Sequence, residues 1–184
     1  MRKWGSLLLL AAGLMLLLAG CKSATMEEAF RQKYPDKGFD LLYSEAAGDR
    51  ELAFFKSPGP DGAAGIGVAV FEGARGKGWT LLQAGTFNDG GKLGADIAKV
   101  DLGSEGAQDV VFGYTDNPNI ARIETVNRQG NAVEAKLVDT DWRKIWFAVG
   151  DFETLSVKAT TADGELVAEV PSPEADAAAG SSIQ

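Results

Sequence analysis

Apolar and polar residues alternate along most of the chain beyond residue 38, and this period of two predicts β-strands. In the first half of the chain, the alternating runs are separated by segments rich in glycine, proline and aspartate, which favour turns. Four strands are expected, at residues 39–43, 51–56, 66–72 and 79–87. Their short connections predict an antiparallel sheet.

A helix is predicted before these strands. Thr25 and Glu28 have the spacing of a capping box, in which Thr25 accepts a hydrogen bond from one backbone amide and Glu28 reaches back to another. Residues then repeat at helical spacing as far as Lys33, and Pro35 ends the segment. Residues 25–88 are therefore expected to form a small α+β unit.

Six further strands at regular spacing are predicted in the second half of the chain. They are expected at residues 110–114, 120–126, 133–138, 144–149, 155–161 and 166–170. Asp163-Gly164, flanked by alternating residues, is a strong hairpin signal. This pattern is typical of a β-sandwich of the immunoglobulin-like class, although the cysteine–tryptophan–cysteine signature of true members is absent.

The rest of the chain predicts less regular structure. Residues 89–108 begin with a glycine-rich stretch and are expected to be a linker between the two units. Residues 109–170 would then form the sandwich-like unit, and residues 171–184 are expected to be a disordered tail. The predicted fold is mostly β: an N-terminal helix with a four-stranded antiparallel sheet, followed by an immunoglobulin-like β-sandwich.

The first twenty residues have a different pattern, with three zones. Arg2-Lys3 gives a positive start, Leu7–Leu18 is an apolar run without charge, and Ala19-Gly20 places small residues before Cys21. This layout is typical of a secretory signal at residues 1–20, and its apolar run is short for a membrane span. The alternatives are a plain transmembrane anchor, or a secreted protein with a chance cysteine.

The segment Leu18-Ala19-Gly20-Cys21 closely resembles the lipobox of bacterial lipoproteins. The resemblance implies transfer of diacylglycerol to the Cys21 sulfur, cleavage between Gly20 and Cys21 by signal peptidase II, and acylation of the new amino terminus. Two or three acyl chains anchor a protein stably, whereas a single chain holds it only marginally. The folded part would then sit on a very short lipidated tether, residues 21–24, which suggests a partner close to the bilayer.

The compartment that the lipobox implies is the extracytoplasmic face of the cell membrane. In a bacterium with two membranes it is the outer membrane, because Lys22 stands where an aspartate would signal retention. The second half of the chain also loosely resembles uncharacterised lipoproteins of spore-forming Gram-positive bacteria, a likeness that implies no activity. It rests on Phe112-Gly113-Tyr114, Asn119-Ile120, Ile145-Trp146-Phe147 and Asp163-Gly164.

The chain is acidic, with 18 basic and 26 acidic residues and a formal net charge of −8. Loss of residues 1–20 leaves 16 basic and 26 acidic residues, a net charge near −10. A charge of this sign repels nucleic acid and anionic headgroups, so no nucleic-acid partner is expected. Membrane residence is therefore expected to come from the acyl chains and not from a basic patch.

Missing residue types exclude several chemistries. The chain has no histidine, so histidine-dependent triads and histidine-bearing metal sites are excluded. Its single cysteine, Cys21, is the expected site of lipid attachment and so leaves no thiolate nucleophile. The glycine-rich segment Gly73–Gly78 joins two predicted strands and so offers no helix N-terminus for a phosphate. The chain is expected not to be an enzyme, and no cofactor is predicted beyond diacylglycerol on Cys21.

Two chemistries based on oxygen ligands stay open. Glu134, Asp139 and Asp141 are candidate acids and bases of a cell-wall carbohydrate hydrolase, although Asp139-Thr140-Asp141 also has the sequence of a solvated turn. A ligand- or calcium-binding sensor is the second alternative, and oxygen-bearing side chains are its candidate calcium ligands, although such residues are also common in turns. Its candidate ligands are Asn88-Asp89-Gly90 with Asp96, or Asp116, Asn117 and Asn119.

Tryptophans are the candidates for a binding surface. Trp146 falls on the strand face opposite Ile145 and Phe147, where it either marks a binding surface or packs against the first unit. Trp142 and Trp79 have the same ambiguity. The leading hypothesis is a non-catalytic, lipid-anchored module whose β surface binds an envelope protein or a glycan close to the membrane.

Overall fold

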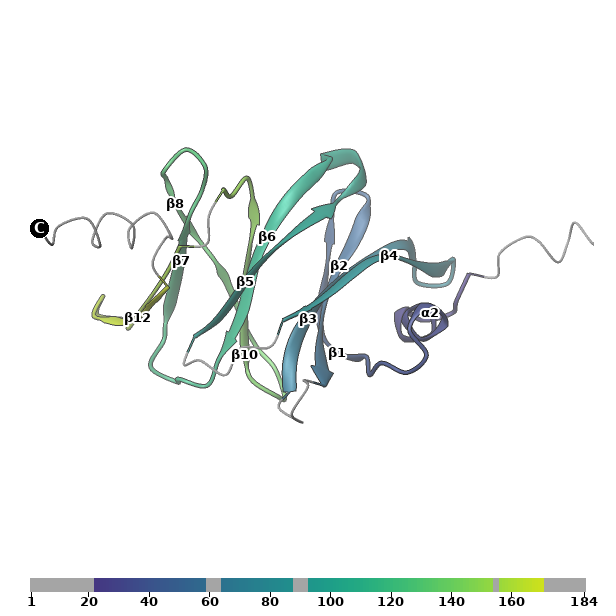
Figure 1. Cartoon of the computed structure of the whole chain (residues 1–184), viewed down its shortest axis with the longest axis horizontal. Coiled ribbons are helices and arrows are strands. Elements are labelled where there is room, and N and C mark those ends of the chain that lie inside the picture. The colour runs from purple at the N-terminus through teal and green to yellow at the C-terminus, as the bar shows by residue number, and fades with distance from the viewer. Residues whose placement is uncertain (1–21, 59–63, 88–92, 154–155, 171–184) are drawn as a thin grey trace, which may run out of the picture.

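The computed structural model describes residues 22–58, 64–87, 93–153 and 156–170. The expected signal peptide with Cys21, and the expected tail at 171–184, lie outside these residues. In the described part the protein is mostly β, with one short α-helix, a 3-10 turn and three four-stranded antiparallel sheets. The sheets are stacked, and the helix packs on the outer face of the first of them (Figure 1).

The first sheet follows the predicted α+β unit. Helix α2 (Met26–Lys33) precedes four strands that pair in chain order. These strands are β1 (Asp40–Ala47), β2 (Arg50–Pro58), β3 (Ala64–Ala74) and β4 (Gly78–Phe87). The capping box is confirmed, because the Thr25 hydroxyl accepts from the Glu28 amide at 3.1 Å and the Glu28 carboxylate accepts from the Ala24 amide at 2.9 Å.

The other two sheets contain eight strands, and the 3-10 turn η1 (Gly103–Glu105) lies in the connection between β5 and β6. The middle sheet has the order β5-β6-β10-β9, and the outer sheet has the order β12-β11-β7-β8. Their bounds are β5 (Gly94–Asp101), β6 (Ala107–Thr115), β7 (Arg122–Val126), β8 (Ala132–Glu134), β9 (Lys136–Asp139), β10 (Lys144–Gly150), β11 (Val157–Thr160) and β12 (Leu166–Val170).

Two of the expectations for strands in the second half of the chain need correction. The predicted linker at 89–108 contains β5, which pairs with β6 over its whole length. The small and polar residues of this segment gave no strand signal. The strand is stabilised by its pairing with β6 and by Val100, which is buried between the first and middle sheets. The strand expected at 133–138 divides at Ala135, so that β8 joins the outer sheet and β9 joins the middle sheet.

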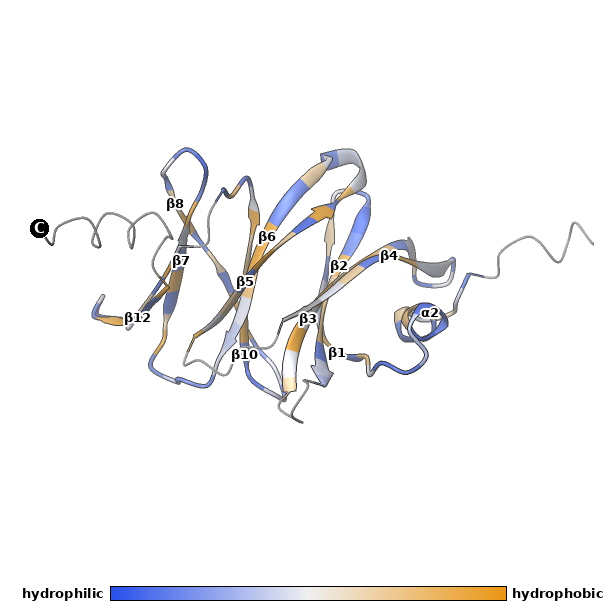
Figure 2. Ribbon diagram, in the orientation of Figure 1, coloured by the Kyte–Doolittle hydropathy of each residue, from blue (hydrophilic) through white to orange (hydrophobic). Residues whose placement is uncertain are grey.

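Both faces of the inner strands are apolar, and this composition produces the layered core. On β2, Leu52 and Phe54 face the middle sheet, whereas Ala53 and Phe55 face α2. On β10, Ile145 and Phe147 face the first sheet, whereas Trp146 faces the outer sheet. Full burial of such side chains contributes about 1.5–3 kcal/mol each. Figure 2 shows hydrophobic residues along β5 and β6 in the middle of the molecule.

Candidate functional site

The candidate site is a hollow of about 310 Å³ at one end of the middle sheet. Two connections form it: the segment after β6 and the segment between β9 and β10. Their ends meet because Thr115 pairs with Lys144, and Lys144 pairs with Asp139 on its other side. The hollow is lined by Thr115, Asp116, Asn117, Pro118, Asp139, Trp142, Arg143 and Lys144.

Short polar side chains fix the backbone of both connections. The Asn117 side-chain oxygen accepts from the Asn119 amide at 3.0 Å, and the Asn117 amide donates to the Thr115 hydroxyl at 3.1 Å. In the other connection, the Thr140 hydroxyl accepts from the amides of Trp142 and Arg143 at 3.2 and 3.1 Å. Such turns hold a loop in one conformation, so the walls of the hollow are preformed.

Arg143 occupies the centre of this arrangement. Its guanidinium carbon lies 4.7 Å from the ring centroid of Tyr114 and 4.8 Å from that of Trp142. The two rings are themselves 5.2 Å apart. Its Nε donates to Asp116 Oδ1 at 2.9 Å, so an ion pair and two cation–π contacts fix the guanidinium.

The carboxylates at the hollow have cationic neighbours. Asp116 pairs with Arg143, and Asp139 Oδ1 lies 3.9 Å from Lys144 Nζ. Lys144 Nζ also donates to the Ile120 carbonyl at 3.3 Å. The hollow therefore presents mixed charges beside an aromatic wall, an arrangement that suits a polar ligand with hydroxyl, amide or carboxylate groups.

The proposed carboxylates of a hydrolase are not brought together. Asp139 lines the hollow, whereas Asp141 is exposed on the neighbouring turn and is not among the lining residues. Glu134 lies on β8 of the outer sheet, where its carboxylate pairs with Arg122 at 3.1 Å. The solvated-turn interpretation of Asp139-Thr140-Asp141 describes this segment better.

The calcium candidates are partly assembled. Asp116 and Asn117 line the hollow, but their oxygens already accept from Arg143 and from the Asn119 amide. Asp96 lies on β5 and accepts from the Ile97 amide, while the segment 88–92 is outside the described residues. Across the described ranges, no three histidine, cysteine, aspartate or glutamate side chains are grouped to hold a metal ion.

The three tryptophans have different positions. Trp142 is half-buried in the wall of the hollow, and Trp79 is half-buried beside α2. Trp146 is fully buried between the middle and outer sheets, so neither expectation for it is correct. The middle sheet is covered on both sides, and Ile145 and Phe147 on the opposite face contact the first sheet instead.

Ser23 joins the segment before α2 to the first sheet. The Ser23 amide donates to the Trp79 carbonyl at 3.0 Å, and the Trp79 amide donates back to the Ser23 carbonyl at 2.7 Å. This isolated bridge attaches the N-terminal segment to the first residues of β4. This contact was not expected, because Ser23 lies in the segment interpreted as a tether, although Trp79 begins an expected strand.

Sequence reasoning also missed Arg143. Its contacts depend on Tyr114 and Asp116, which are distant in the sequence and join it only through the pairing of β6 with β10. The Trp142-Arg143 pair was a possible signal, because these side chains together often form binding surfaces.

Comparisons with protein-family models, with curated proteins and with solved structures find no match to this chain. Among the described residues, no helix has the length and apolar character of a transmembrane span.

Proposed function

We propose that this chain is a membrane-anchored extracytoplasmic lipoprotein and a non-catalytic binding or structural module of the cell envelope. The sequence Leu18-Ala19-Gly20-Cys21 supports the anchor. The observation that carries the proposal is the position of this motif relative to the fold. The bridge between Ser23 and Trp79 begins two residues after Cys21, so the layered domain starts directly after the proposed lipid.

We further propose that the middle and outer sheets form an immunoglobulin-like sandwich. If β5 to β12 are lettered A, B, C, C′, D, E, F and G in chain order, the sheets have the orders A-B-E-D and G-F-C-C′. Immunoglobulin domains have strands A, B, E and D in one sheet and strands C, F and G in the other. The first sheet adds a third layer on the A-B-E-D side.

The hollow around Arg143 is the proposed binding site of this module. It lies at the end of the sandwich where the B–C and D–E connections meet, and immunoglobulin domains bind ligands through loops at one end. Its aromatic wall, its fixed guanidinium and the amide of Asn117 suit an envelope glycan or a polar protein segment. The hydrolase and calcium alternatives are less well supported, because the acidic side chains lie apart or are already paired.

Cell fractionation with Cys21→Ser tests the anchor. The wild-type chain should be recovered with membranes and should incorporate a labelled fatty acid in growing cells. Cys21→Ser should lose the label, and no mature chain of this variant should be recovered with the membranes. Ser23→Ala, which retains Cys21, should behave as wild type. Equal membrane recovery and labelling of wild type and Cys21→Ser would contradict the proposal.

A further inference from the structure

A second hollow, of about 550 Å³, lies at the opposite end of the stack from the outer sheet. It is formed by the start of α2, the start of β1 and the β3–β4 turn. Its lining combines apolar, aromatic and charged side chains: Ala24, Thr25, Met26, Glu27, Phe39, Asp40, Leu41, Arg75 and Trp79. Trp79 was a candidate binding residue from the sequence, but the function proposed above assigns no ligand to this hollow.

The hollow lies beside the proposed lipid attachment point. Trp79, which lines it, is the residue that exchanges two hydrogen bonds with Ser23. Extended chain covers at most about 3.6 Å per residue, so the backbone of Cys21 is within about 7 Å of Ser23. An acyl chain on Cys21 that enters a bilayer must therefore bring this end of the domain to the membrane surface.

The side chains around the hollow suit the boundary between hydrocarbon and headgroups. Leu41 is 46% exposed, although most large apolar residues of the described chain are buried. Trp79 and Met26 are half-buried and contact the apolar cluster under α2. Tryptophan is enriched at membrane interfaces, because its ring is apolar and its indole N–H is polar.

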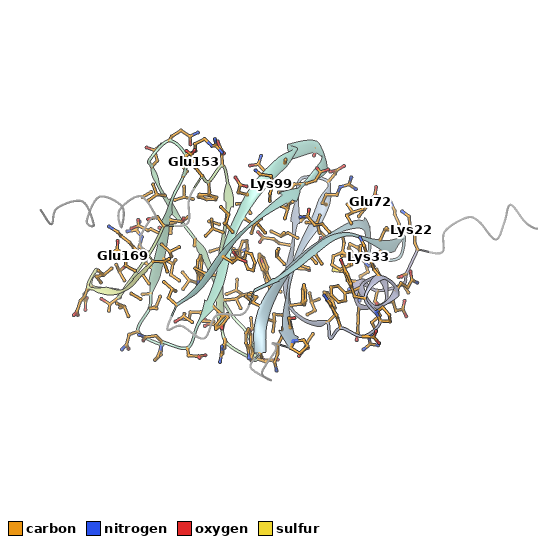
Figure 3. The ribbon with its side chains drawn as sticks, viewed as in Figure 1. Lys22, Lys33, Glu72, Lys99, Glu153 and Glu169 are labelled. Carbon is orange, nitrogen blue, oxygen red and sulfur yellow. The ribbon has the colours of Figure 1, made fainter. Side chains whose placement is uncertain are left out.

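Charge is distributed unevenly along the molecule. Residues 22–41 and 74–78 carry six basic and four acidic side chains, whereas the whole chain has 18 basic and 26 acidic residues. Lys22, Arg75 and Lys77 are exposed and form no ion pair within the described residues, while Glu27 is paired with Arg31. Figure 3 shows Lys22 and Lys33 at the α2 end and Glu169 at the far end.

We propose that this end of the domain is seated on the phospholipid bilayer that holds the anchor, an inference that rests on the lipid anchor proposed above. Leu41 and Trp79 lie at the depth of the headgroups, and Lys22, Arg75 and Lys77 contact lipid phosphates. The acyl chains provide residence on the membrane, and this surface sets the orientation of the domain. Sheets stack about 10 Å apart, so the outer sheet faces away from the membrane about 20 Å beyond the first sheet.

The test uses the mature, lipid-modified chain, which begins at Cys21, reconstituted into vesicles of phosphatidylcholine with phosphatidylglycerol. Brominated lipids in the same vesicles quench tryptophan emission at the headgroup boundary. We expect wild type to be quenched, Trp79→Phe to lose most of the quenching, and Trp142→Phe to retain it. Near-ultraviolet circular dichroism checks that each variant is folded.

Charge reversal gives a second test that leaves Trp79 in place. Arg75→Glu with Lys77→Glu should lower the quenching of Trp79, and the loss should be smaller in vesicles of phosphatidylcholine alone. The matched control is Arg128→Glu with Lys158→Glu at the distal part of the molecule, which should leave the quenching unchanged.

Flotation of the same vesicles separates the two proposals. Wild type that floats with the vesicles but shows no quenching of Trp79 would overturn the seated orientation and leave the anchor intact. Wild type that carries no lipid and does not float would overturn both. Flotation together with quenching that depends on Trp79 supports both.

Discussion

Lys136 on β9 donates a hydrogen bond to Glu45 on β1, and this ion pair links the middle sheet to the first sheet. Its ammonium group also donates to the Tyr43 hydroxyl at 2.6 Å and lies 5.0 Å from the centroid of that ring. The hydrogen bond to Glu45, and then that to Tyr43, raise the pKa of Lys136 from 10.5 to about 12. The two units are thus joined by a polar contact at the rim of an apolar interface.

This contact predicts a pH dependence of stability at alkaline pH. Because the pKa of Lys136 is higher in the folded state, its contribution is complete below pH 10.5 and is lost as the pH rises through about 12. Lys136→Met should lower the midpoint of thermal unfolding at neutral pH, and its difference from wild type should shrink between these values. Lys158→Met, which removes an exposed pair on the outer sheet, is the control and should show a smaller effect. A difference that is as large at pH 12 as at neutral pH would contradict this assignment.

Because the interface between the first and middle sheets is apolar, we expect the first sheet to unfold together with the other two. The rings of Phe54 and Phe147 lie 4.4 Å apart across the first and middle sheets, and both are buried. Phe54→Ala and Phe147→Ala should each lower the free energy of unfolding by about 3–5 kcal/mol. Urea unfolding followed by fluorescence and by far-ultraviolet circular dichroism should give one coincident transition. Two separate transitions, with only one moved by each substitution, would show independent domains.

A close backbone approach makes Gly113 sensitive to any substitution that adds a Cβ. A Cβ at this position would lie 1.7 Å from the Gly94 carbonyl oxygen and 2.7 Å from Trp146 Cζ2. Gly113→Ala should therefore destabilise the protein by about 1–3 kcal/mol or more, since β5 and the buried indole must move. Gly85→Ala is the matched control, because nothing lies within 4 Å of its added Cβ. Equal unfolding midpoints for the two variants would show that this packing is wrong.

The sequence predicts most of the strands, because runs of apolar residues, many of them alternating with polar ones, are separated by turn residues. It does not predict which sheet each face contacts, because strands such as β10 are apolar on both faces, and so the location of Trp146 was missed. It also misses β5, whose small and polar residues become a strand only through pairing with β6. The contacts of Arg143 could not be predicted from the sequence for the same reason, because Tyr114 is brought beside it only by strand pairing.

If the hollow around Arg143 is the binding site, crosslinking in intact cells should give a specific adduct there. A photoreactive residue at position 117, replacing Asn117, should capture a discrete neighbour, either a protein or a glycan. Arg143→Met should reduce the yield several-fold, because it removes the guanidinium that Asp116 and the two rings hold in place. The same probe replacing Lys158 on the outer sheet is the control and should not give that adduct. Equal adducts from both positions would show that the hollow is not the binding site.

Mass spectrometry of the mature N-terminal peptide decides whether Cys21 carries a lipid. We expect a chain that begins at Cys21, with diacylglycerol on its sulfur and an acyl group on its amino terminus. A mature chain that retains residues 1–20, or that carries a bare thiol at Cys21, would contradict it.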